Sequence, residues 1–246
     1  IRTISNKKPE GFRSWPGGPP PPQVLPAQPG YNRVAWRFNR NDLPPVDDVF
    51  VFGYLGGSSV APGRYQLRLS LGEEVSETTV NVLPNPAIKA SKQDFIEQQT
   101  MLLTIEETVK EMHEAVNNMR SAKAQIKQHE KLLKSQEGTE ALTEKGDVLV
   151  KRISTWEENL IQPKQKTFQD VINFNNKLNS QLLNLAGYID QADPKVTQGA
   201  KDRLKDLLAD WQVYKNEHND IISKEMAAYN TAYQKLKLPA IILNKK

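Results

Sequence analysis

The chain has 246 residues, enough for one large domain or two modest ones with hydrophobic cores, and no cysteine, which excludes disulfides and thiolate metal sites. Its net charge of +4 is shared by both halves, with nine Lys and Arg against seven Asp and Glu in residues 1–88, so no basic cluster predicts a nucleic-acid partner. No apolar run approaches the roughly 18–20 residues that cross a bilayer, so we expect no membrane insertion. Residues 1–6 also lack the apolar stretch of a secretion signal.

The composition changes sharply near residue 88. Thirteen of the 16 prolines and nine of the 13 glycines come before that position. After it, apolar residues recur every three or four positions, which is typical of helices. We therefore predict an α+β protein with two domains, a β module at 1–88 and a helical bundle at 89–246.

The β module contains a proline-rich segment at residues 9–30, with eight prolines and Trp15. Such a segment could be a polyproline ligand for an aromatic groove or an ordered loop against the rest of the module. We favour the loop, with Trp15 tucked into it, because no flanking charges mark a docking motif.

Three segments of the first half then read as strands. Residues 32–38 and 64–71 alternate apolar and polar side chains, and residues 49–54 form an apolar run typical of a buried strand. A turn at Gly72 returns the chain as a fourth strand at 75–83. The alternation predicts that Tyr65, Leu67, Leu69 and Leu71 are buried in a small all-β sandwich, or in part of one.

The second half predicts four helices, at about 92–134, 140–161, 168–190 and 198–237. Their expected N-terminal caps are Ser91 with Asp94, Thr167 with Asp170, and Thr197. Gly138, Pro163, Pro194 and Pro239 are the expected breaks. We predict a four-helix bundle in which two long antiparallel helices are completed by the shorter pair. An open dimeric coiled coil is the alternative, disfavoured because the shorter helices carry apolar stripes of their own.

No constellation of residues predicts catalysis. The three histidines, His113, His129 and His218, lack the spacing of a helical metal site. Adjacent carboxylates such as Glu157 and Glu158 diverge on a helix and cannot act on one substrate. We therefore expect no catalytic residue, no metal site and no cofactor.

Asparagine is frequent between residues 173 and 184. Asn173, Asn176 and Asn179 could form a polar face that binds a partner. The alternative, which we favour, is a helix whose solvent-exposed side happens to be rich in asparagine, although asparagine is a poor helix former with a preference for local backbone bonds.

Several motifs resemble a known group of proteins. Residues 1–5 (IRTIS), 30–38 (GYNRVAWRF) and 60–69 (VAPGRYQLRL) resemble the later strands of Ig-like domains of the flagellar-hook-capping type. Residues 85–86 (NP) and 168–174 (FQDVINF) are similar to the C-terminal region of exported bacterial BNR-repeat proteins, sortilin-like β-propellers often labelled glycosyl hydrolases.

The resemblance implies an Ig-like sandwich that lacks its opening strands, and a periplasmic or cell-surface location in a bacterium. Any hydrolase activity would belong to a propeller outside this chain, and no catalytic residue transfers to it.

Two functions follow as hypotheses. The first is a non-catalytic structural or protein-interaction module that binds a protein partner or the rest of its own parent chain. The second is a carbohydrate-binding accessory module in which Trp15, Tyr31 and Tyr54 stack on sugars. A hydrolase with an unrecognised site is a third possibility, and it would require a cleft with converging carboxylates.

Overall fold

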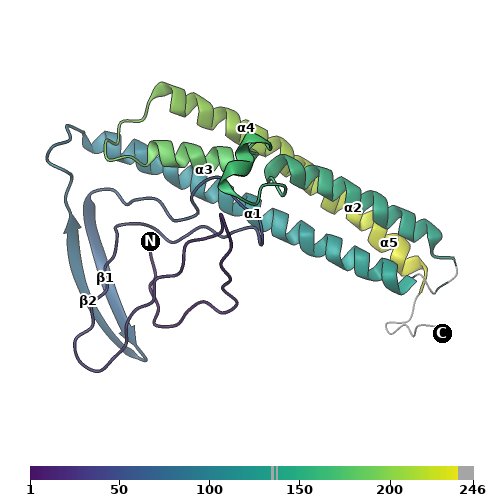
Figure 1. Ribbon diagram of the computed structural model, residues 1–246, viewed down its shortest axis with the longest axis horizontal. Coiled ribbons are helices and arrows are strands. Elements are labelled where there is room, and N and C mark those ends of the chain that lie inside the picture. The colour runs from purple at the N-terminus through teal and green to yellow at the C-terminus, as the bar shows by residue number, and fades with distance from the viewer. Residues whose placement is uncertain (134–135, 137, 238–246) are drawn as a thin grey trace.

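A computed structural model describes residues 1–133, 136 and 138–237 and shows a mixed α+β protein (Figure 1). The first half contains one two-stranded antiparallel sheet, formed by β1 (Gly63–Leu71) and β2 (Glu74–Val82). The second half is helical. Its helices are α1 (Lys92–Leu133), α2 (Glu140–Leu160), the short 3₁₀ helix η1 (Phe168–Ile172), α3 (Leu178–Ile189), α4 (Gln198–Asp220), the π-helical turn η2 (Ile221–Met226) and α5 (Ala227–Lys235).

The predicted capping residues are confirmed, although the pair at Thr167 and Asp170 caps only a short 3₁₀ turn. The Asp94 carboxylate accepts from the backbone N–H of Ser91 at 2.7 Å, while the Ser91 hydroxyl accepts from the N–H of Asp94 at 3.2 Å. Thr167 and Asp170 form the same reciprocal box before η1. The Thr197 hydroxyl accepts from the N–H of Ala200 and starts α4. Residue 134 and Pro239, where we expected two helices to end, lie outside the described residues.

The predicted helix at 168–190 is wrong in its first half. Residues 168–172 form only the 3₁₀ turn, residues 173–177 are irregular, and α3 begins at Leu178. Asn173, Asn175 and Asn176 fall in this gap, where asparagine competes with helical hydrogen bonding through local backbone contacts.

The two long helices are α1 and the continuous run of α4, η2 and α5. They are parallel, so the predicted antiparallel pair is also wrong. Glu97 and Glu111 of α1 pair with Lys201 and Lys215 of α4, respectively, so both helices run in the same direction. Helix α2 runs the opposite way, since Lys127 pairs with Asp147 and Arg120 with Glu157.

The two shorter helices lie one after the other along the long pair (Figure 1). Helix α3 contacts the first half of α1 and α4, and α2 contacts α1 and α5. Both shorter helices run antiparallel to α1, so together they act as one interrupted helix that packs against the two long ones. The helical part is therefore an up-down-up arrangement with three helices in cross-section. Because the chain reverses direction twice, the first and the last of these helices are parallel.

A salt-bridge cluster explains why Lys123 interrupts the apolar stripe of α1. Its ammonium lies 2.7 Å from the carboxylate of Glu157 on α2, which also pairs with Arg120 at 2.7 Å. Glu157 is buried, so two cations with hydrogen bonds compensate the loss of its hydration.

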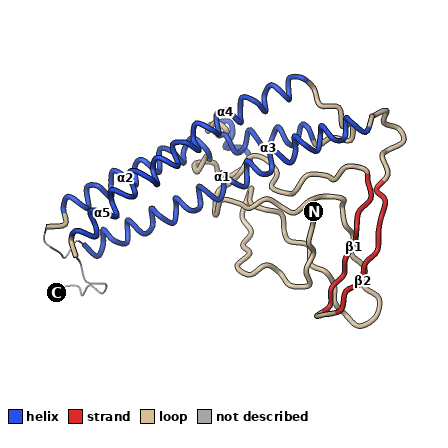
Figure 2. Tube along the Cα trace, turned by 180° about the vertical axis from the view of Figure 1, so that it is seen from behind, coloured by secondary structure: helices blue, strands red, loops and turns tan. Residues whose placement is uncertain are grey.

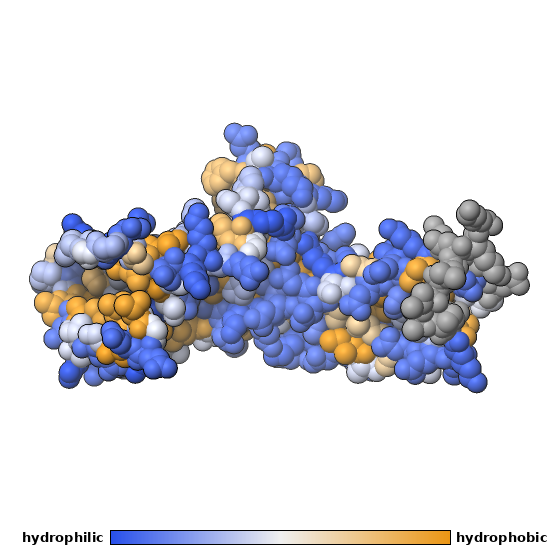
Figure 3. Space-filling view, turned by 90° about the horizontal axis from the view of Figure 1, so that it is seen from below, coloured by the Kyte–Doolittle hydropathy of each residue, from blue (hydrophilic) through white to orange (hydrophobic). Residues whose placement is uncertain are grey.

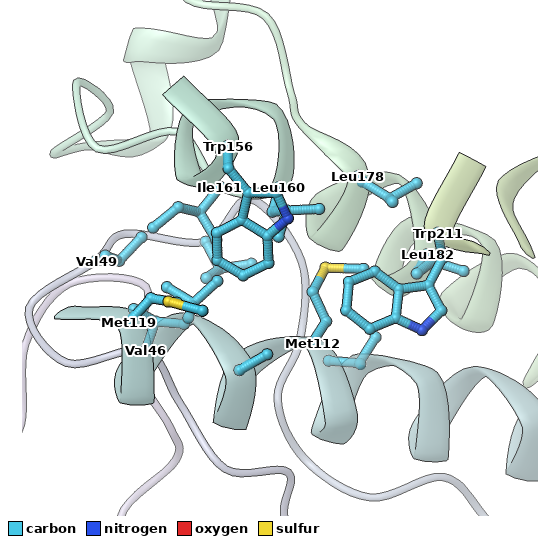
Figure 4. Close-up of a cluster of buried hydrophobic side chains, with 14 of the residues drawn as sticks. Val46, Val49, Met112, Met119, Trp156, Leu160, Ile161, Leu178, Leu182 and Trp211 are labelled. Carbon is cyan, nitrogen blue, oxygen red and sulfur yellow. The ribbon is translucent and has the colours of Figure 1, made fainter. Parts of the chain in front are cut away.

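The hydrophobic core crosses the composition change at residue 88. Five apolar residues of the first half join the helical core: Leu43, Val46, Val49, Val51 and Leu55. Figure 4 shows Val46 and Val49 beside Met119 of α1 and Ile161 at the end of α2. Figure 2 shows the loops of the first half lying beside α1. Residue 88 thus marks a change of secondary structure, while the packing is continuous across it.

Two predicted strands are absent from the described first half. Residues 32–38 form no ladder, and Phe38 interrupts the extended backbone with a φ of 57°. Residues 49–54 are not a strand either, although Val49 and Val51 are buried as expected. Their apolar side chains pack on helices, and the N–H of Val51 bonds to the carbonyl of Gly17 instead of to a neighbouring strand. None of the described helices combines the length and apolar character needed to cross a membrane.

Candidate interaction surface

The three aromatic residues expected as stacking platforms differ in accessibility. The Trp15 indole donates a hydrogen bond to the carbonyl of Val49 at 2.8 Å, and its ring lies so close to Gly18 that a Cβ there would be 2.7 Å away. Trp15 is therefore part of the ordered loop, as we favoured. Tyr31 and Tyr54 are 92% and 66% exposed.

The asparagines expected as a partner-binding face point in different directions. Asn173 is exposed, whereas Asn176 is half-buried and accepts from the side-chain amide of Gln165 at 3.0 Å. Asn179 is buried on α3 against α1. Asn184, one turn further, donates to the carbonyl of Phe52 at 2.8 Å. The structure therefore uses part of this asparagine cluster to attach the first half of the chain to α3.

His113 of α1 lies at the same contact between the first half of the chain and α3, and it is fully buried. Its Nδ1 is 2.7 Å from the carbonyl oxygen of Pro44, and its Nε2 is 3.2 Å from the Asn179 amide nitrogen. A neutral ring satisfies both partners, with Nδ1–H donating and Nε2 accepting. Burial lowers the pKa of His113 to about 4, against the weaker opposite effect of the Pro44 carbonyl. The geometry is that of a structural histidine.

The carboxylates near the core are engaged in structural contacts. Glu157 holds two cations, and Glu106 accepts from the N–H of Ser58 at 2.7 Å. The residues that the structure describes hold no group of three acidic or histidine side chains placed to bind a metal ion.

A row of exposed leucines on β1 is the most prominent apolar feature on the surface of the β1–β2 hairpin. The register pairs Tyr65 with Val80 and Leu67 with Thr78, which places all odd-numbered residues of β1 on one face. On that face Leu67, Leu69 and Leu71 are 43%, 58% and 75% exposed. The residues of β2 that pair with these leucines, Thr78, Ser76 and Glu74, are polar. The opposite face carries the ion pair between Arg68 and Glu77 together with the exposed Val75. Figure 3 shows apolar residues gathered at the end of the molecule that holds the hairpin.

Only the base of this face is covered. Trp36 packs edge-on against Tyr65, with ring centroids 5.6 Å apart, and contacts Phe38 in the same way at 5.2 Å. Alternation correctly predicted one apolar face, but the expected burial of Leu67, Leu69 and Leu71 is wrong. Residues 32–38, which we expected to form a strand, supply only these aromatic contacts near Tyr65.

A groove of about 630 Å³ lies beside the covered end of the hairpin. Its walls are the start of β1, the link between β2 and α1, and the first turns of α1. Two cationic residues, Arg40 and Lys92, line it, and no acidic residue does. No pattern in the sequence indicates this groove, because its residues are scattered from 40 to 103 and share no motif.

The chain matches no known family, no curated protein and no solved structure at the significance we required.

Proposed function

We propose that this chain is a non-catalytic protein-interaction module of a larger exported bacterial protein, and that it binds through the open half of its hairpin face. The observation that carries the proposal is the row formed by Leu67, Leu69 and Leu71, which is apolar, contiguous and exposed. Contiguous exposed apolar surface is unfavourable in water, and it is a common mark of a protein-binding site.

The proposed partner is a β-sheet. A two-stranded sheet is only marginally stable by itself and needs a packed face. Here only the base of the face has a cover, made by Trp36. A second sheet laid over the leucines would complete an Ig-like sandwich, the fold that the motifs at 30–38 and 60–69 resemble. That sheet would come from a partner protein or from the rest of the parent chain.

A site-specific photocrosslinker tests this proposal. We would place benzoylphenylalanine at Leu69 and, as the matched control, at Ser70, the next residue on the opposite face. Crosslinking in source cells should yield a defined protein adduct, or an adduct with the parent chain, from position 69 only. Equal crosslinking from both positions, or none from either, would contradict the proposal.

Carbohydrate binding is the second candidate, and the exposure of Tyr31 and Tyr54 favours it. Exposed aromatic rings offer the flat apolar surface on which sugars stack. Affinity electrophoresis with soluble polysaccharides should then show retardation that Tyr31→Ala or Tyr54→Ala removes. Trp15→Ala is unsuitable as the test, because it also removes the indole hydrogen bond to Val49.

A further inference from the structure

The groove at the base of the hairpin is apolar on most of its walls. Pro62 and Tyr65 form the hairpin side, and Phe95, Ile96 and Leu103 form the α1 side. Ile96 and Leu103 are 47% and 44% exposed, although α1 turns most of its apolar side chains into the core. The groove is therefore an apolar surface separate from the leucine face of the hairpin.

Its charge is of one sign. Arg40 and Lys92 line the groove, and within the described residues neither forms an ion pair with a carboxylate. The nearby acidic groups have other partners, since Asp94 caps α1 and Glu106 accepts from Ser58. A ligand with negative charge would thus meet no carboxylate on the walls.

Arg40 is held in place for such a contact. One of its terminal nitrogens donates to the Gln99 side chain at 2.7 Å, and the Gln99 amide donates to the carbonyl of Ser59 at 2.9 Å. Arg40 is half-buried, and its Nε is buried without a hydrogen-bond partner in the described residues. No carboxylate of the described residues pairs with this guanidinium, so its positive charge is available to a negatively charged group that occupies the groove.

We propose that this groove binds an extended segment of a partner protein in which an acidic side chain lies among apolar ones. The apolar side chains would contact Tyr65, Phe95 and Ile96, and the carboxylate would lie between Arg40 and Lys92. Complementary charge mainly selects the partner, while the buried apolar surface supplies affinity. This site is distinct from the leucine face, so the inference does not rest on the proposed hairpin contact.

The test is fluorescence polarisation with three labelled octapeptides, in which leucine alternates with aspartate, asparagine or lysine. We expect the aspartate peptide to bind about tenfold more tightly than the asparagine peptide at low salt, from two partly exposed charge contacts. The lysine peptide should bind most weakly. The preference should shrink at about 0.5 M salt, because exposed charges are then screened within a few ångströms.

Variants locate the binding. Arg40→Gln combined with Lys92→Gln should reduce binding of the aspartate peptide to the level of the asparagine peptide, and Phe95→Ala should weaken all three peptides. Leu69→Lys on the hairpin should change none of them, which separates this proposal from the previous one. Lys92→Glu is a second charge test at an exposed position, where we expect little effect on folding, and it should weaken binding of the aspartate peptide further.

Four results would overturn the proposal. The first is equal affinity for the three peptides, and the second is full binding by the Arg40 and Lys92 variants. The third is no binding of the aspartate peptide at millimolar concentration. Displacement of that peptide by dodecanoate at equal concentration would also overturn it, because the site would then recognise a fatty carboxylate.

Discussion

His113 connects three segments that are far apart in the chain. It belongs to α1, and its two ring nitrogens contact the carbonyl of Pro44 and the side chain of Asn179 on α3. Protonation would place a second N–H donor against the Asn179 amide, whose oxygen already accepts from the N–H of Ser180 at 2.7 Å. The contact between these segments is therefore more stable with a neutral ring.

The stability of the protein should depend on this proton. The pKa of His113 is about 4 in the folded protein, below its ordinary value of 6.5, so the unfolded chain binds the proton more tightly. The contribution is complete above pH 6.5 and declines as the pH falls toward 4. The total loss should be about 3 kcal/mol, from the size of the shift.

Urea denaturation at pH 7, 5.5 and 4 measures this loss. The carboxylates contribute in the same direction, so the informative quantity is the difference from His113→Gln, which shares those carboxylates. The variant should be less stable than the parent at pH 7 and should lose less free energy of unfolding on acidification. Identical pH dependence in the two proteins would show that His113 is not the group responsible.

Helix ends are determined locally in this chain. Thr197 precedes α4 with an extended backbone, and its hydroxyl accepts from the N–H of Ala200 at 3.2 Å. The same residue type acts differently inside a helix, where the hydroxyl of Thr155 donates to the carbonyl of Lys151 one turn earlier. The two threonines therefore form a matched pair for measuring the cap.

Thr197→Ala should lower the free energy of unfolding by about 1 kcal/mol, because it leaves a helix N–H without its acceptor. Thr155→Ala should change it by less than about 0.5 kcal/mol, since alanine suits an exposed helix interior. Thermal denaturation followed by circular dichroism compares the two. Equal effects would mean that the cap contributes nothing of its own.

At the scale of the whole molecule, the loops of the first half and the helices share one core. Val46 is fully buried among the core residues, together with Val49 and Val51 from the same segment. A destabilising substitution in this segment should therefore also lower the stability of the helices. If the two halves folded separately, the loss of stability would be confined to the first half.

Val46→Ala should shift the unfolding midpoint of the helical circular dichroism signal, with a loss of about 2 kcal/mol for a cavity in a packed core. Val34→Ala is the control, because Val34 is 42% exposed and lies in the same half. It should leave the midpoint nearly unchanged. An unaffected helical signal in Val46→Ala would support two independent folding units divided near residue 88.

Local patterns were sufficient to predict the hairpin and most of the helices of the second half, with the exception of residues 168–177 and the π-helical turn η2. Capping residues, three-four periodicity and breaks at Gly138 and Pro194 act over a few residues, so they predict where elements begin and end. The same is true of the turn between β1 and β2, where Gly72 adopts a φ of 59° that glycine tolerates readily.

Only the tertiary structure decided which apolar faces of the helices and strands pack against one another. A periodic stripe indicates that a face favours burial, but it does not identify the neighbour that buries it. Residues 49–54 are buried by helices rather than by a sheet, and the leucines of β1 remain exposed. The direction of the long helices depended on the link at 161–177, which lets α3 continue in the direction of α2. Side-chain hydrogen bonds from Gln162 and Gln165 to Asn175 and Phe174 shape this link, and amide contacts of this kind follow no periodic pattern in the sequence.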